Sequence, residues 1–321
     1  MDLFRSARAV TGASGSGYVD WPAVAEAAKA STAPGDLDLS AAERSGYATD
    51  VREARERLQT LGGVDFDLPE TVEIQNRHHW IDANVDTFKR VMAPVEAGTP
   101  TPLLPGLSRV INTGTLSVLL AFLGRNVLGQ YDPLLLAEAD PADREHGLYF
   151  VHPNIVAVAE SLDVSLPRFR RWIAFHEVSH AAEFGAAPWL STHLEERLER
   201  GIDALTEGGL DREAFAELDT AMTAVEGYAE LLMDRAFDDD YADLRAKLDA
   251  RRQGGGPLAR LARRLLGLGL KRRQYERGAA FFRAVADARG LEGASAVWER
   301  PENLPTDAEL DDPEQWLARV A

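Results

Sequence analysis

The chain has 321 residues, 45% of them hydrophobic, with a formal net charge of −17 and no cysteine. A chain of this length can bury a full core, as one large domain or two closely packed ones. The absence of cysteine excludes disulfides and thiolate metal sites, so any metal must be bound by histidine and carboxylate groups, and the negative charge argues against general nucleic-acid binding.

The N-terminal part of the chain is predicted to be helical. We expect a short helix over residues 21–29, a charged helix over residues 41–61 and a further helix over residues 71–95. The last of these carries His78 and His79. Adjacent residues on a helix point about 100° apart, so these two histidines cannot chelate one ion together.

A proline-rich segment, residues 99–105, is the predicted linker. It separates an N-terminal helical region, residues 1–98, from a catalytic region, residues 99–321, and we expect the two to form one compact unit. The longest apolar stretch, residues 116–128, is too short to span a bilayer, which predicts a buried helix and no stable membrane insertion. No basic segment followed by an apolar run opens the chain, so we expect a cytoplasmic protein.

One strand and two long helices are predicted in the catalytic region. Residues 147–151 favour a strand, with His152 at its end. An edge strand beside a metal-binding helix can bind an extended substrate by strand addition. A helix follows from Leu166 to about Gly185, with Ser165 as its N-cap, and another spans residues 211–237. The predicted fold class is therefore mainly α, an α+β fold with a small sheet.

The segment His176-Glu177-Val178-Ser179-His180 has the H-E-x-x-H pattern of zinc hydrolases. Residues four apart lie on one face of a helix, so His176 and His180 can both reach one ion. A catalytic zinc ion keeps three protein ligands and an open position for water. Glu177 is then a base beside that water rather than a ligand. The alternative interpretation is a half-buried helix with two histidines and a solvated glutamate.

The third ligand has to come from another part of the chain. Glu226, on the helix predicted over residues 211–237, is our candidate, and Glu230 one turn later would orient a ligating histidine. Gly227 would let the two helices approach closely. His193 is the rival ligand. Taken alone, Glu226 could also belong to an ordinary acidic helix face.

Residues 251–277 form a basic amphipathic segment, with nine Lys or Arg residues and one acid, Glu276. Such a segment can contact an anionic membrane surface. The alternative, which we favour, pairs its arginines with neighbouring carboxylates and places its leucines in the core.

Further stretches over about residues 70–320 carry a wider resemblance. They are Asn76-Arg77, Gly129-Gln130-Tyr131-Asp132, Pro188-Trp189-Leu190, Glu226-Gly227-Tyr228-Ala229-Glu230, Leu270-Lys271-Arg272-Arg273-Gln274-Tyr275 and Asn303-Leu304-Pro305-Thr306. With these and the H-E-x-x-H segment, the chain resembles the zincin-like hydrolase family associated with coenzyme F-420 biosynthesis. The resemblance implies a zincin-like metalloprotease architecture and a metal-dependent hydrolase, and it implies no particular substrate.

The patterns together predict zinc-dependent hydrolysis of an amide or peptide bond, of the glutamate-zincin type. Zn²⁺ on His176, His180 and Glu226 would polarise the water and the substrate carbonyl, while Glu177 passes the proton of the water to the leaving nitrogen. The resemblance favours Tyr275 as the donor to the developing oxyanion. Other possible donors are Tyr228, His152 and His193. The alternative for the whole chain is a catalytically inactive zincin-like scaffold that acts through protein contacts.

Overall fold

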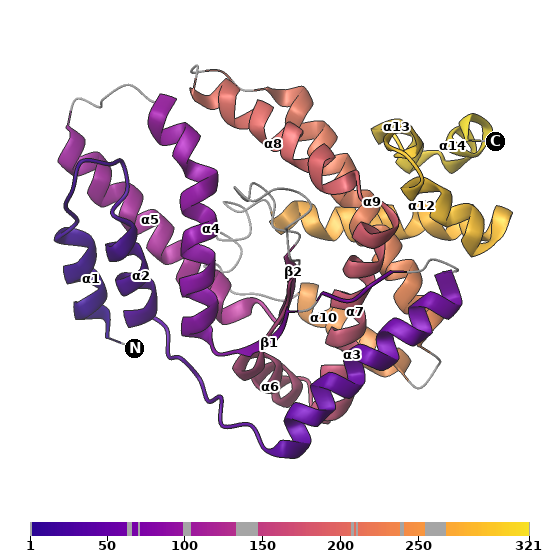
Figure 1. Cartoon of the computed structure of the whole chain (residues 1–321), viewed down its shortest axis with the longest axis horizontal. Helices are drawn as coiled ribbons and strands as arrows, with labels where there is room; N and C mark the ends of the chain where they lie inside the picture. The colour runs from indigo at the N-terminus through magenta and orange to yellow at the C-terminus, as the bar shows by residue number, and fades with distance from the viewer. Residues whose placement is uncertain are drawn as a thin grey trace.

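Helices make up most of the molecule, and one small sheet lies near its centre (Figure 1). This computed structural model describes residues 2–62, 66–69, 71–98, 104–132, 147–206, 209, 211–237, 241–253 and 268–320. The predicted fold class, mainly α with a small sheet, is confirmed. Residues 99–103 of the predicted linker and residues 254–267 of the basic segment lie outside the described residues.

Four helices form one end of the molecule, on the left of Figure 1. They pack around a small apolar cluster that includes Val24, Ile81 and Leu120, all without exposed surface. The predicted helix over residues 21–29 is confirmed. The four helices are α1 (Leu3–Thr11), α2 (Trp21–Ala30), α4 (Arg77–Gly98) and α5 (Pro105–Asn126).

Helix α5 differs from the expectation for residues 116–128. It is 22 residues long, because Pro105 begins the helix well before the apolar stretch. By length and composition it could cross a membrane, yet only 22% of its most apolar window is buried. The prediction of a short buried helix was therefore wrong, because α5 packs on α1, α2 and α4 but leaves one side exposed.

Within the part of the chain that the structure describes, three strands form the sheet, in the order β1-β3-β2. They are β1 (Thr71–Gln75), β2 (Gly129–Asp132) and β3 (Gly147–Val151). The predicted strand is confirmed as β3, but it is the central strand, so its expected role as the edge beside the metal-binding helix was wrong. That edge is β2, which contacts α7 and pairs antiparallel with β3. The predicted helix over residues 71–95 was wrong in its first turn, which is β1, paired parallel with β3.

The larger apolar cluster surrounds the helix that carries the H-E-x-x-H segment, α7. The predicted helices at residues 41–61 and 211–237 are confirmed as α3 and α9. The remaining elements are α3 (Ala41–Gly62), α6 (His152–Ser161), α7 (Leu166–Ala186), α8 (Leu190–Thr206), α9 (Arg212–Ala236), α10 (Ala242–Gln253), α12 (Leu268–Ser295), α13 (Asp307–Asp311), α14 (Pro313–Arg319) and the short 3-10 helices Ala296–Trp298 and Pro301–Asn303.

Residues from both sides of position 98 contribute to each apolar cluster. The larger cluster contains Tyr47 and Leu58 of α3, and the smaller contains Leu120 of α5. The division into residues 1–98 and 99–321 stays a prediction.

Helix α7 is fixed to α3 by a buried ion pair. Arg170 Nε donates to Asp50 Oδ2 over 2.6 Å, and both side chains are only 9% exposed. Gly46 makes room for this contact, since a Cβ atom at Gly46 would lie 2.3 Å from the Arg170 guanidinium. Ser165 stands at the predicted N-cap of α7, but its side chain makes no capping hydrogen bond. The start of α7 is therefore held by tertiary contacts and by Pro167 in the first turn.

Helices α9 and α12 meet backbone to backbone. A Cβ atom at Gly227 would lie 2.4 Å from the carbonyl carbon of Gly278, and one at Gly278 would lie 2.3 Å from the carbonyl oxygen of Thr223. Only glycine fits on both sides of such a contact. The expected close approach at Gly227 therefore exists, but its partner is α12 rather than the H-E-x-x-H helix.

Candidate metal centre

Two helices bring three candidate metal ligands together. His176 and His180 lie one turn apart on α7, with ring centroids 4.8 Å apart. Glu226 comes from α9, which packs on α7, and it is 5% exposed. One ligand atom from each of His176, His180 and Glu226 lies within 4.8 Å of the other two. The structure thus assembles the three residues that the sequence selected as metal ligands.

The His180 ring bridges two carboxylates. Its Nδ1 lies 2.8 Å from Glu183 Oε2, and its Nε2 lies 3.9 Å from Glu226 Oε2. A proton on Nδ1, donated to Glu183, leaves the lone pair of Nε2 directed to the side where Glu226 lies. Glu183 therefore fixes the orientation of this ring.

Burial and charge shift the ionisation of this pair. Burial alone would lower the pKa of His180, but the hydrogen bond that its ring donates to Glu183 and the charges of Glu183, Glu226 and Glu177 outweigh it and raise the pKa to about 9. Burial raises the pKa of Glu183 to about 7, against the opposing effect of His180. A buried imidazole surrounded by carboxylates attracts a cation, either a proton or a metal ion.

Sequence reasoning missed Glu183. The signal was present, because Glu183 follows His180 by three residues and so lies on the same face of one helix. The predicted orienting residue was Glu230, whose Oε2 accepts a 2.7 Å hydrogen bond from Arg245 of α10. An orienting role for Glu230 on a histidine stays a prediction.

Glu177 points to the sheet edge. Its Oε2 accepts a 3.0 Å hydrogen bond from the backbone N–H of Tyr131 in β2. Its side chain also packs over Gly129, where a Cβ atom would lie 2.6 Å from Glu177 Cγ and Oε1. The side chain is buried, with 6% of the residue exposed. The edge strand thus fixes the position of the carboxylate next to the first histidine.

The predicted oxyanion donors lie in varied surroundings. Tyr228 is a core side chain that packs edge-on against Phe282 and Trp298. His152 Nδ1 lies 3.1 Å from the hydroxyl of Tyr47. His193, which was also the rival metal ligand, packs edge-on against Trp189. The side chain of Tyr275 lies outside the described residues. Among the described residues, the metal-ligand cluster does not include His193.

The donor set fits a divalent metal ion of zinc type. Two imidazole nitrogens and one carboxylate oxygen are a common protein ligand set for catalytic zinc, with bonds of roughly 2.0–2.2 Å. The cluster has no sulfur ligand, in agreement with a chain without cysteine. A mainly helical fold with an H-E-x-x-H helix, a glutamate from a later helix and a strand edge beside them defines the class of zincin-like metal hydrolases.

Comparison with known proteins places the chain in that class. A family model described as "Zincin-like metallopeptidase" matches residues 19–209 and 204–317. The chain belongs to this family. It is also similar to a solved structure described as a "putative hydrolase with a novel fold" from Chloroflexus aurantiacus, with 31% identity, a TM-score of 0.73, and coverage of 100% of this chain and 98% of the other. No curated protein matches the sequence.

Proposed function

We propose that the chain is a zinc-dependent peptidase or amidase whose metal ligands are His176, His180 and Glu226. The observation that carries this proposal is the approach of their three ligand atoms to within 4.8 Å, next to a buried Glu177. The family membership supports peptide substrates and zinc binding. The link to coenzyme F-420 and the glutamate-zincin subtype stay predictions.

Each residue of the site has a separate task. A zinc ion bound there would supply Lewis-acid chemistry, because it acidifies water and polarises a carbonyl group. Glu177 accepts the proton of the attacking water and returns it to the leaving nitrogen. The N–H of Tyr131 holds one oxygen of Glu177, so the carboxylate does not have to find its orientation during the reaction. Glu183 keeps the proton of His180 on Nδ1.

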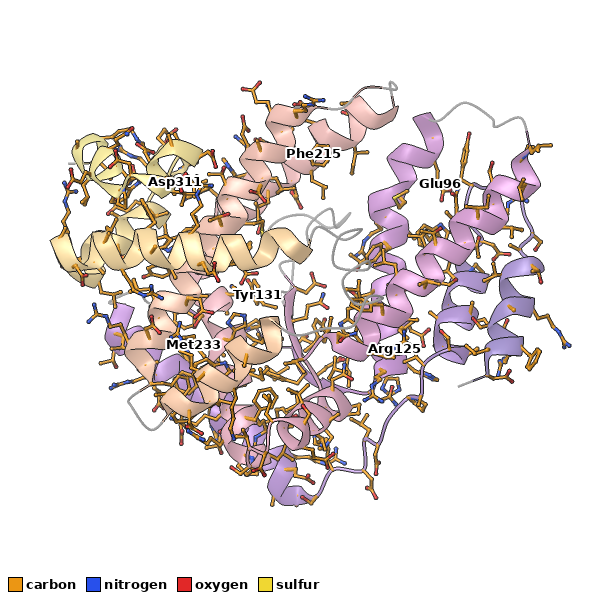
Figure 2. The ribbon with its side chains drawn as sticks, turned by 180° about the vertical axis from the view of Figure 1, so that it is seen from behind. Glu96, Arg125, Tyr131, Phe215, Met233 and Asp311 are labelled. Atoms are coloured by element: carbon orange, nitrogen blue, oxygen red, sulfur yellow. The ribbon has the colours of Figure 1, made fainter. Side chains whose placement is uncertain are left out.

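The outer edge of β2 supports an extended substrate. The N–H of Val151 donates to the carbonyl of Leu128, which sets the alternation of the antiparallel pair. The backbone groups of Gly129 and Tyr131 therefore face away from β3. The Tyr131 N–H is already bonded to Glu177, so a peptide that pairs with the remaining outward backbone groups of this edge lies beside the proposed base. Figure 2 shows Tyr131 near the centre of the molecule.

The test combines metal analysis with a search for activity. Protein purified without chelator should contain about one equivalent of zinc, and His180→Ala and Glu226→Ala should both lose it. The zinc form should cleave members of a mixed peptide library, read by mass spectrometry. Bound zinc without any cleavage would favour the inactive scaffold, and zinc retained in both variants would refute the ligand assignment.

A further inference from the structure

Exposed hydrophobic side chains concentrate on two helices far from the metal centre. Among the described residues, seven large hydrophobic side chains are exposed, and six of them lie on α1, on α5 or at the N-cap of α5. Phe4 is 92% exposed and Val118 is 70% exposed. The seventh, Val72, lies on β1. The six are Leu3, Phe4, Leu104, Leu107, Ile111 and Val118.

The α5 residues form a continuous stripe. Leu104, Ile111 and Val118 are spaced by seven residues, so they lie along one side of the helix. Leu107, one turn after Leu104, widens the stripe, and Arg125, seven residues after Val118, continues it with an exposed cation. The opposite side of α5 packs on the protein. The stripe is thus a second apolar face of the same helix.

Helix α1 extends this face. A Cβ atom at Gly114 of α5 would lie 3.2 Å from Val10 Cγ1, so the two helices touch there. Leu3 precedes Val10 by seven residues and so lies on the side of α1 that meets α5. No residue of α1 is buried. Figure 1 shows α1 and α5 together at the end of the molecule opposite α12–α14.

The charge of the helices that form and support this face is opposite to that of the whole protein. Helices α1, α2 and α5 contain five Lys or Arg residues and one acid, Glu26, whereas the chain has 35 basic and 52 acidic residues. Helix α5 itself has no acidic residue. An apolar face flanked by Arg8 and Arg125 therefore complements a surface that is apolar inside and negatively charged outside.

We propose that this α1/α5 face docks on the surface of an anionic lipid bilayer. Its apolar side chains enter the boundary between headgroups and acyl chains, and its arginines contact lipid phosphates. The helix does not leave the protein to cross the bilayer, because Asn154 Nδ2 donates to the Gly124 carbonyl over 2.9 Å and Thr113 Oγ1 accepts from the Asp20 N–H over 3.0 Å. A second copy of the chain fits less well, because a symmetric contact would oppose two cationic faces.

Flotation of the full-length protein with vesicles tests the proposal. The protein should float with vesicles of phosphatidylcholine and phosphatidylglycerol and remain below vesicles of phosphatidylcholine alone. The double variant Ile111→Ser/Val118→Ser and the double variant Arg8→Gln/Arg125→Gln should each reduce the partition coefficient about tenfold or more. Val72→Ser is the matched control, because Val72 is an exposed hydrophobic residue that lies outside the α1/α5 face. Circular dichroism establishes that each variant is folded.

Three results would overturn the proposal. The first is no flotation of the unchanged protein with the anionic vesicles. The second is flotation that both double variants retain, which would assign membrane binding to another part of the chain, such as residues 251–277. The third is a dimer in light scattering that Ile111→Ser/Val118→Ser converts to a monomer, which would make a second copy the occupant of this face.

Discussion

The region around α7, α9 and α12 and the layer of α1, α2 and α5 depart from the usual distribution of side chains in opposite directions. The first buries charged groups, such as Glu183 with no exposed surface. The second exposes apolar groups, such as Phe4. Both arrangements are costly unless something compensates them. In the first region the compensation lies inside the protein, in hydrogen bonds and a proposed metal ion, whereas in the second it has to come from outside.

The largest effect should come from the proposed base. Glu177→Gln removes the proton acceptor but keeps the shape of the side chain and its contact with the Tyr131 N–H. We expect peptide hydrolysis to fall by about 10²–10⁴-fold with zinc content unchanged. Single-turnover assays and metal analysis measure the two quantities. Loss of zinc from this variant would mean that Glu177 is a ligand, and full activity would mean that another group is the base.

Gly129→Ala tests whether the sheet edge positions that base. The new methyl group would meet Glu177 Cγ and Oε1 at 2.6 Å and push the carboxylate away. Moving the Glu177 carboxylate away from its position should reduce kcat by about 10²-fold while zinc stays bound. Gly106→Ala is the control, since its methyl group meets nothing within 4 Å. Equal kcat values for the two variants would show that the contact between Glu177 and β2 does not position the base for the reaction.

Glu183→Gln tests the buried carboxylate on His180. Loss of the charge that holds the ring should weaken zinc binding by about 10–100-fold, since the residue orients a ligand without being one. Competition with a chromogenic chelator gives the dissociation constant. The same measurement on Glu230→Gln tests the sequence-based prediction that Glu230 orients a histidine. An unchanged affinity for zinc in the Glu183 variant would mean that the buried Glu183 carboxylate does not support metal binding through His180.

Gly227→Ala tests the helix contact behind the site. Its methyl group would lie 2.4 Å from a backbone atom of Gly278, so the helices have to separate. Such overpacking should lower the free energy of unfolding by about 1–3 kcal/mol. Urea denaturation measures this value, again against Gly106→Ala. A stability equal to that of the control would show that α9 and α12 can move apart freely.

The smallest effect should come from the exposed stripe. Ile111→Ser should change the free energy of unfolding by no more than about 0.5 kcal/mol, because its side chain is 57% exposed. Leu120→Ala, on the buried side of the same helix, should cost about 2–5 kcal/mol. A large loss in the Ile111 variant would mean that the stripe supports the fold, and the contrast between the two regions would disappear.

The sequence predicted those features that depend on local spacing. His176 and His180 follow from residues four apart on one helix, and the helix that carries Glu226 follows from a long helical pattern. Strand β1 was missed, because residues 71–75 are stabilised as a strand by pairing with β3, more than seventy residues later. The position of β2 beside α7 depends on the same long-range pairing, and no local pattern encodes it.

The contact between Gly227 and Gly278 limits which substitutions the interface between α9 and α12 can accept. Because main chain touches main chain, no side-chain rotamer can absorb a change in helix spacing. Glu226 immediately precedes Gly227, so the position of its carboxylate depends on how α9 packs against α12. Among the described residues, α12 itself contributes no residue to the metal-ligand cluster. Warming that loosens this contact would move Glu226 away from His176 and His180, so we expect heat inactivation to begin with loss of the proposed zinc ion.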